Sequence, residues 1–276
     1  MTGGIITVAP TGAEVSKADF PPLPVTLDEL VDTAVSCEEA GASIIHVHIR
    51  GEDALPTLDL GRLTDTVDAL RSATDLVVQL STGGAVTDPE SDRLRVLDAR
   101  PDMASCTMGT VNFGDAVFMN RWDFITELHK SMRDKGVVPE YEIFDLGHLT
   151  NLARLLDKHG LPHGGHVHVD FVLGVPGGAS GDAPTVTAMA DAVRRYLPEG
   201  TTFSATGIGR TTMPVMLTSV AAGGHLRVGM EDTTSFRRGE KVASNAQLAE
   251  RAADALRLAG REVLDPEGTR KLLGIG

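Results

Sequence analysis

Two histidines separated by one valine, His46 and His48, are the residues of this sequence best suited to bind a metal ion. The largely apolar run 42–45 leads directly into them, which is typical of a buried strand. Residues two apart on a strand point to the same face, so both imidazoles can reach one cation. A distant carboxylate from Glu231 or Asp232 could complete three protein ligands with an open position, the arrangement of a catalytic zinc site. Two core histidines bonded to backbone groups are the alternative.

Length, charge and composition restrict the class of protein. A chain of 276 residues can form two small domains or one α/β barrel. The formal net charge of −13 argues against general nucleic-acid binding, and no run of about 18 apolar residues predicts a membrane span. The N-terminus begins with a strand-like segment rather than a basic region and a signal-type apolar stretch. Because Cys37 and Cys106 lie in apolar contexts, we expect buried free thiols and a cytoplasmic protein.

Short apolar strands alternate with amphipathic helices along the sequence. The predicted strands are 5–9, 44–49, 76–80, 103–106, 140–144, 167–173, 202–206 and 226–229. The predicted helices are 27–40, 60–73, 90–99, 122–135, 148–159, 185–196, 212–222 and 245–259. Thr26 and Glu29 form a predicted capping box, and Gly41, Gly136 and Gly160 are expected to end helices.

This alternation predicts a closed parallel (β/α)8 barrel, a TIM barrel, formed by residues 1–276 as a single domain. An open doubly wound sheet is the alternative. No Gly-x-Gly-x-x-Gly follows the first strand and no linker interrupts the pattern, so closure is favoured. In such barrels the chemistry collects where the strands end. Those ends carry residues 11–14, His46 and His48, residues 81–84, Thr107, Glu140 and Glu142, His166, His168 and Asp170, residues 207–210, and Arg227 with Glu231 and Asp232.

Several of these groups have a simpler interpretation beside the chemical one. Glu231 and Asp232 could bind a metal and contact a substrate or Arg227, or they could form an exposed acidic turn. Residues 81–84 could bind a carboxylate or oxyanion through backbone N–H groups, or form a tight glycine turn. Arg210, after a Gly-Ile-Gly sequence, could bind a phosphate group or make a surface ion pair.

Two further polar sets follow the fifth and sixth predicted strands. Glu140 and Glu142 could balance a metal charge or receive a cationic substrate group, although an ion pair with a lysine or arginine is equally compatible. His166, His168 and Asp170, with His163 upstream, form a rival metal cluster that ranks below the first, or they line the pocket. His129 and His159 fall on polar helix faces, where we expect them to be solvated.

Longer motifs resemble the β-keto acid cleavage enzymes. They are Ala-Pro-Thr-Gly-Ala (9–13), His-Val-His-Ile-Arg (46–50), Gln-Leu-Ser-Thr-Gly-Gly (79–84), Arg-Pro-Asp-Met-Ala-Ser (100–105), Val-Asn-Phe-Gly-Asp (111–115), Glu-Ile-Phe-Asp (142–145), Val-Leu-Gly-Val-Pro-Gly-Gly (172–178) and Gly-His-Leu-Arg-Val-Gly-Met-Glu-Asp (224–232). Ser-Asn-Ala (244–246) and Gly-Arg-Glu-Val (260–263) also fit. The resemblance is specific in order and covers essentially the whole chain.

The resemblance implies a zinc-dependent barrel that condenses a β-keto acid with acetyl-CoA and releases acetoacetate and a new acyl-CoA. It implies that the keto and carboxylate oxygens of the substrate chelate zinc, which acidifies the carbon between them as a Lewis acid. Homo-oligomers, tetramers or dimers, are also implied. Matched position by position, the zinc ligands are His46, His48 and Glu231, and the base is Asp232, oriented by Arg227. The substrate-side residues are Ser81, Gly84 and Thr107 around the carboxylate or oxyanions, Glu14 as a first-loop acid, and Glu142 as the residue that meets an amino group in the aminohexanoate-cleaving member. Arg210 is expected to contact the phosphates of CoA because of its place after the seventh strand rather than through this match.

Two segments differ from the family pattern. Residues 163–170 are far more polar than expected for that strand, and residues 118–122 lack the usual acidic and proline-rich character. The side chain of the keto acid therefore stays open: Glu142 and Asp170 favour a cationic one, and neutral or acidic ones remain compatible. Two other functions also remain, a zinc hydrolase that uses metal-bound hydroxide and a non-catalytic barrel that binds a keto acid.

Overall fold

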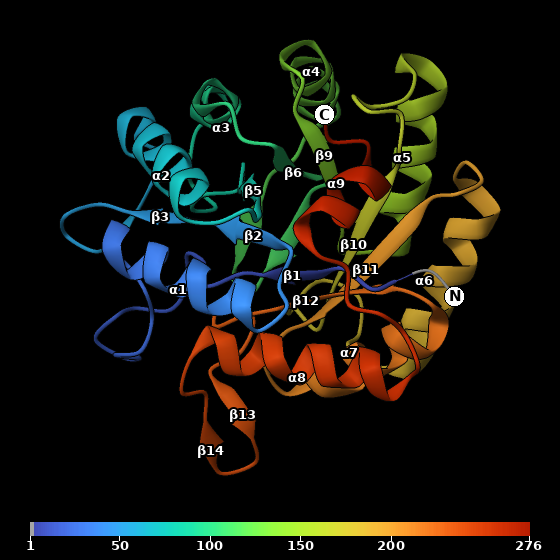
Figure 1. The fold of residues 1–276 in the computed structure, drawn as a ribbon. Helices are drawn as coiled ribbons and strands as arrows, with labels where there is room; N and C mark the ends of the chain where they lie inside the picture. The colour runs from blue at the N-terminus through green and yellow to red at the C-terminus, as the bar shows by residue number, and fades with distance from the viewer. Residues whose placement is uncertain (1–2) are drawn as a thin grey trace.

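The computed structural model describes residues 3–276, which form a closed barrel of eight parallel strands surrounded by helices (Figure 1). The strands lie in the order β1-β12-β11-β10-β9-β6-β5-β2 around the barrel. They are β1 (Ile6–Val8), β2 (Ile44–Val47), β5 (Val77–Leu80), β6 (Met103–Thr107), β9 (Val138–Ile143), β10 (His168–Leu173), β11 (Thr202–Gly207) and β12 (His225–Val228). The predicted TIM-barrel fold is confirmed, and each predicted strand overlaps one barrel strand.

The helices around the barrel begin and end largely where the sequence predicts. Thr26 accepts a hydrogen bond from the Glu29 N–H and Glu29 bonds back, which confirms the capping box. Gly136 ends its helix with a left-handed φ of 74°. The helices are α1 (Leu27–Glu39), α2 (Leu60–Ala73), α3 (Glu90–Arg95), η1 (Val96–Ala99), α4 (Trp122–Lys135), α5 (Leu146–His159), α6 (Ala183–Tyr196), η2 (Gly209–Thr211), α7 (Thr212–Ala222), α8 (Asn245–Leu258) and α9 (Pro266–Leu273).

Helix α9, which the sequence did not predict, covers the N-terminal end of the barrel. Asp265 caps this helix through the Gly268 N–H, and Pro266 occupies its first position. Leu273 packs in one apolar cluster with residues at the starts of barrel strands, such as Ile44 and Val138. In Figure 1, α9 lies in front of the barrel strands. Because this end is closed by apolar side chains, any ligand must enter from the opposite, C-terminal mouth.

Three short hairpins extend the loops after barrel strands. They are β3 (Ile49–Arg50) with β4 (Pro56–Thr57), β7 (Val111–Phe113) with β8 (Ala116–Phe118), and β13 (Ser235–Arg237) with β14 (Glu240–Lys241). Each hairpin follows the C-terminal end of its strand, and Phe113 and Phe118 of the β7–β8 hairpin line the cavity at the mouth. Within residues 3–276 no helix is both long and apolar enough to cross a bilayer.

Alternate strand residues point into the barrel, and several of these inward-pointing residues are polar. Along β10, Val169 and Phe171 pack in the apolar layer beneath the helices, whereas Asp170 accepts hydrogen bonds from two hydroxyls of the neighbouring strand β11 inside the barrel. Outside the barrel, His129 is fully buried on α4, and its Nδ1 lies 2.8 Å from the Tyr141 hydroxyl. The expectation that His129 is solvated is therefore wrong, since a polar ring can be buried when it has a partner. Cys37 and Cys106 are buried and free, as expected.

Candidate metal centre and substrate pocket

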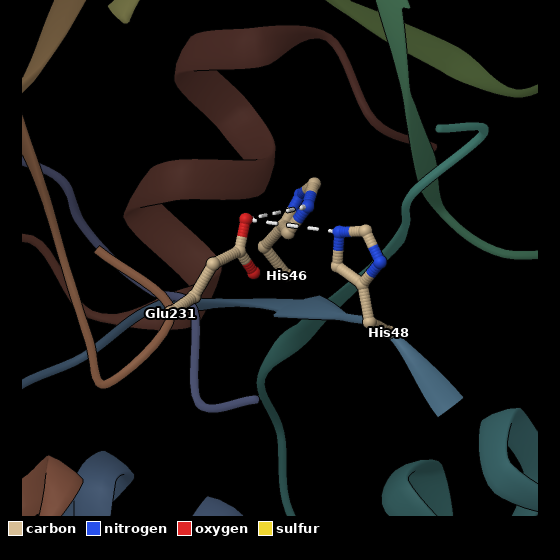
Figure 2. A group of neighbouring side chains, drawn as sticks. All are labelled: His46, His48 and Glu231. Carbon is tan, nitrogen blue, oxygen red and sulfur yellow. Dashed lines mark ion pairs between the residues drawn. The ribbon is translucent and has the colours of Figure 1, made fainter. Parts of the chain in front are cut away.

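His46 and His48 project together into the barrel mouth, because β2 carries the first and ends one residue before the second. Their ring centroids lie 5.4 Å apart. Glu231 approaches from the loop after β12, so that its Oε1 lies 4.0 Å from His46 Nε2 and 3.7 Å from His48 Nε2 (Figure 2). Among residues 3–276 these three side chains are the group of potential metal ligands whose donor atoms lie within 4.8 Å of one another. The structure thus brings together the three ligands that the sequence suggested.

The protonation states of these groups suit a divalent cation. Burial lowers the pKa of His46 to about 4, and the positive charge of Arg227 acts in the same direction. Burial also lowers the pKa of His48. For Glu231 burial acts to raise the pKa, but Arg227 and the two imidazoles outweigh it and lower the value to about 2. Two neutral imidazoles and one ionised carboxylate are the forms in which these side chains bind metal.

Two buried polar atoms at this centre have no hydrogen-bond partner in the described structure. They are His46 Nε2 and Glu231 Oε2. The other ring nitrogen, His46 Nδ1, lies 2.5 Å from Gln79 Oε1, and because that oxygen can only accept, Nδ1 carries the proton. The lone pair of His46 Nε2 is therefore directed toward Glu231. Buried polar atoms are costly when they stay unpaired, so the residues present fit a bound metal ion.

Arg227 on β12 links the candidate metal centre to a second carboxylate. Its Nη2 donates to Glu231 Oε1 and, over 3.0 Å, to Asp232 Oδ1, while its Nε lies 3.4 Å from Asp232 Oδ2. Asp232 is 3% exposed, so the alternative of an exposed acidic turn is wrong. Burial raises the pKa of Asp232 to about 7, although Arg227 acts to lower it. A carboxylate with such a pKa can accept and release a proton near neutral pH.

The turn after β12 depends on Gly229. A Cβ at this position would lie 1.9 Å from the Ala9 carbonyl oxygen, which only glycine avoids. The N–H groups of Asp232 and Thr233 both donate to the Gly229 carbonyl, and the Glu231 N–H donates to Ala9. The close approach of β12 to β1 therefore determines where Glu231 and Asp232 lie.

A cavity of about 370 Å³ opens beside these groups. Its described lining includes Glu14, Ser81, Gly84 and Glu142, four of the residues that the sequence placed near the substrate. Glu14 is exposed at the rim, and Ser81 Oγ accepts a hydrogen bond from the N–H of the turn at residue 83 over 3.0 Å. Gly84 has a positive φ of 51°, which a tight turn at this position requires.

Thr107 and Arg210 lie outside the described lining of the cavity. Thr107 donates to Glu142 Oε2 over 2.5 Å and so acts on the pocket through that carboxylate. Burial raises the pKa of Glu142 to about 7, with Arg227, whose Nη1 lies 3.7 Å from Glu142 Oε1, acting to lower it. Arg210 is exposed on η2, next to the pocket residue Gly209. Within residues 3–276 Arg210 forms no ion pair, whereas a surface ion pair was one of the two interpretations of the sequence.

His168, the first residue of the sixth barrel strand, and His166, two residues before it, lie away from the pocket. His166 Nε2 and His168 Nδ1 each lie 2.8 Å from the Thr202 hydroxyl, at the N-terminal ends of their strands. His168 Nε2 is 3.5 Å from Glu140 Oε2, and both side chains are fully enclosed inside the barrel. Neither His166 nor His168 lines the cavity, and among residues 3–276 they form no metal-binding group with Asp170. The alternative interpretations of these histidines as a rival metal cluster or as pocket residues are therefore wrong.

Asp170 also differs from its expected role. It accepts hydrogen bonds from the Ser204 and Thr206 hydroxyls, each over 2.7 Å, and is fully buried below the pocket. Burial and the neighbouring Glu140 raise its pKa to about 6. Because it does not line the cavity, Asp170 is not available to a cationic substrate group.

Sequence reasoning missed Gln79 and an apolar part of the pocket. Gln79 pairs with His46 in the register of β2 and β5, which a sequence reveals only once the barrel order is known. The apolar part includes Phe113 and Phe118 from the β7–β8 hairpin. Phe118 belongs to residues 118–122, a departure from the family pattern that was expected to affect the substrate side chain, whereas no local signal placed Phe113 at the mouth.

The fold and these groups define a (β/α)8 barrel with a candidate metal centre and a buried carboxylate–arginine pair at the C-terminal mouth. A family model described as beta-keto acid cleavage enzyme matches residues 4–275. This chain belongs to that family.

Relatives of known name match over nearly the full length. A 3-keto-5-aminohexanoate cleavage enzyme from Fusobacterium nucleatum is 38% identical over 273 residues, which cover 98% of this chain and 97% of the relative. A 3-oxoadipate:acetyl-CoA acetyltransferase from Cupriavidus necator is 32% identical over 272 residues, which cover 98% and 94%. The solved apo structure of ObcA has a TM-score of 0.80 at 18% identity, over 93% of this chain and 66% of that chain. This last likeness concerns the fold alone.

Proposed function

We propose that this protein is a zinc-dependent acyltransferase that converts a β-keto acid and acetyl-CoA to acetoacetate and a new acyl-CoA. His46, His48 and Glu231 would hold the zinc ion. The observation that carries the proposal is the meeting of two neutral imidazoles and a buried carboxylate beside a second carboxylate, Asp232. Membership of the family and the acetyl-CoA-dependent relative from Cupriavidus necator support it.

Asp232 is the proposed base. When bound, zinc supplies Lewis acidity that makes the carbon between the keto and carboxylate groups of the substrate more acidic. Asp232 accepts the proton from this carbon, and its pKa of about 7 suits a base that works near neutral pH. Arg227 contacts both Asp232 oxygens and holds the carboxylate in one orientation. Both Asp232 and Arg227 are buried, and the charge interaction between them is stronger there than in water.

The remaining site residues receive the two substrates. Ser81 and the turn at Gly84 are proposed to hold the carboxylate of the keto acid, since they line the same cavity as Asp232. Glu14 lies at the rim, where it borders the entering substrate. Arg210, exposed beside the mouth, is the proposed contact for phosphate groups of CoA.

The transformation balances without any further reactant. The deprotonated carbon of the keto acid attacks the acetyl carbonyl, a carbon–carbon bond forms, and the thiolate of CoA leaves. The thiolate then adds to the original keto carbon. The bond between the original keto carbon and the carbon that was first deprotonated breaks. This gives the acyl-CoA, and return of the proton to the released carbon gives acetoacetate.

Acetoacetate formation tests the proposal. We expect acetoacetate only when keto acid, acetyl-CoA and zinc-loaded protein are all present, and none after removal of the metal by a chelator. His48→Ala should lose bound zinc and activity together, because one of three ligands is gone. Undiminished turnover by metal-free protein would refute this function.

A further inference from the structure

One half of the barrel mouth, the polar half, carries most of the charged and hydroxyl side chains that line the cavity, and Val15, Val86 and Met230 line it as well. The polar groups follow the adjacent strands β12, β1, β2 and β5, which carry Arg227, Asp232, Glu14, His48 and Ser81. The opposite half belongs to β6, β9, β10 and β11. Cavity-lining side chains there form what we call the apolar wall: Phe113, Phe118, Phe144, Val172, Val175 and Ile208.

The apolar wall is a packed surface rather than a set of loose side chains. The ring of Phe113 meets Phe118 and Phe144 edge-on, with centroids 6.4 and 6.2 Å apart. Val172 and Val175 from the β10 end are buried against the same cluster. Aromatic rings in such edge contacts hold one another in place, so the wall presents a preformed apolar face to the cavity.

Among residues 3–276, each acidic side chain that lines the cavity from this half already has a partner. Glu142 is the acidic residue that lines the cavity there. Its Oε2 already accepts from the Thr107 hydroxyl, and its Oε1 faces Arg227 Nη1 at 3.7 Å. Asp170 bonds to two hydroxyls below the pocket. A cationic group that reached this half would be desolvated without an uncommitted partner, which is costly.

From this division we propose that the substrate is a β-keto acid with an uncharged, apolar substituent beyond its keto carbon, and that the apolar wall contacts this substituent. The inference rests on the proposed function, because that function places the carboxylate and keto groups at the polar half. The substituent then leads across the cavity to the wall. The amide-rich arm of CoA does not match this surface and enters from the open rim.

A matched pair of substrates separates charge from shape. In 5-methyl-3-oxohexanoate a methyl group replaces the ammonium of 3-keto-5-aminohexanoate, and the carbon skeleton is otherwise the same. We expect kcat/KM for the methyl compound to exceed that for the ammonium compound by about tenfold or more. Along unbranched 3-oxo acids, kcat/KM should rise roughly fourfold for each methylene that reaches the wall. Equal or better turnover of the ammonium compound overturns the proposal.

Two variants test the wall itself. Phe113→Ala should lower kcat/KM for 5-methyl-3-oxohexanoate by about tenfold, and lower it less for the shorter 3-oxopentanoate. Val117→Ala is the control, since Val117 lies on the same hairpin but is 49% exposed and outside the cavity lining. This substitution should leave kcat/KM unchanged for both substrates. An equal loss for both substrates in Phe113→Ala contradicts the proposed contact.

Failure of the function and failure of this inference give different results. If 3-oxopentanoate yields acetoacetate but the methyl compound has no advantage, the function stands and the inference is wrong. If no keto acid yields acetoacetate, the function is wrong. Thermal-shift titration with the matched pair then still decides whether the wall prefers the methyl compound, which should stabilise the zinc-loaded protein at lower concentration.

Discussion

Replacing Gln79 by alanine should weaken zinc binding although Gln79 is not itself a proposed ligand. Its Oε1 lies 2.5 Å from His46 Nδ1 and holds the ring with Nε2 directed toward Glu231. Without this acceptor the buried Nδ1–H is left unpaired, which costs about 1 to 3 kcal/mol. Loss of such outer partners of metal-bound histidines typically lowers metal affinity about 10- to 100-fold. The two magnitudes agree, because tenfold in affinity corresponds to about 1.4 kcal/mol.

The zinc affinity can be measured by competition with a chromophoric chelator and by thermal stability. At a free zinc concentration of about 100 times the wild-type Kd, binding stabilises the folded protein by about 2.7 kcal/mol. A tenfold weaker variant gains only about 1.4 kcal/mol at the same concentration. At saturating zinc the variant should recover most of its activity.

Gln79→Glu and Ser43→Ala provide the controls. Glutamate keeps an acceptor for His46 Nδ1 and should restore zinc affinity. Ser43 is fully buried just before β2 and its hydroxyl has no described partner, so Ser43→Ala should leave zinc affinity unchanged. A zinc Kd for Gln79→Ala within about twofold of wild type would show that Gln79 does not orient the ligand.

Three other substitutions probe the base, the turn and the buried core. Asp232→Asn should retain zinc while kcat falls by about 10²- to 10⁴-fold, the usual contribution of a general base; near-normal turnover would mean that the base is misassigned. Gly229→Ala should lower zinc affinity and activity together, because its Cβ would displace the turn that carries Glu231; unchanged metal binding would contradict this reading of the turn. Burial lowers the pKa of His129 to about 4 from 6.5, so the unfolded chain binds a proton that the folded protein does not in that pH range. The free energy of unfolding should therefore fall with falling pH. The slope of this free energy against pH, measured by denaturant titration, should be shallower in His129→Gln by at most about 1.4 kcal/mol per pH unit. An identical slope in the variant would contradict the proposed effect of His129.

The barrel could be predicted from the sequence because its strands and helices are each marked locally. Alternating apolar runs located all eight barrel strands, and polar residues at their ends identified the mouth. His46 and His48 could be linked to Glu231 or Asp232 because strand ends converge in a closed barrel, and the family resemblance selected Glu231. The capping residue Thr26 and the glycine at the end of α4 fixed helix boundaries through short-range hydrogen bonds.

The features that could not be predicted from the sequence depend on contacts between distant segments of the chain. In the sequence, His166 and His168 have the spacing of a second pair of metal ligands. In the structure they lie near the start of β10, where both rings are close to the Thr202 hydroxyl. His129 looks solvated from its helix neighbours, and only the Tyr141 hydroxyl from β9 explains its burial. Two members of the apolar wall, Phe113 and Phe118, lie on a hairpin of two three-residue strands, which is too short for a periodic signal.

A crystal structure of the zinc-loaded protein, with anomalous scattering measured at the zinc absorption edge, is the most direct test of the proposed centre. The predicted result is an anomalous peak between His46 Nε2, His48 Nε2 and the Glu231 carboxylate, with Asp232 still bonded to Arg227. A zinc ion bound elsewhere in the chain, with Glu231 turned away from both imidazoles, would contradict the proposed metal centre and the chemistry built on it.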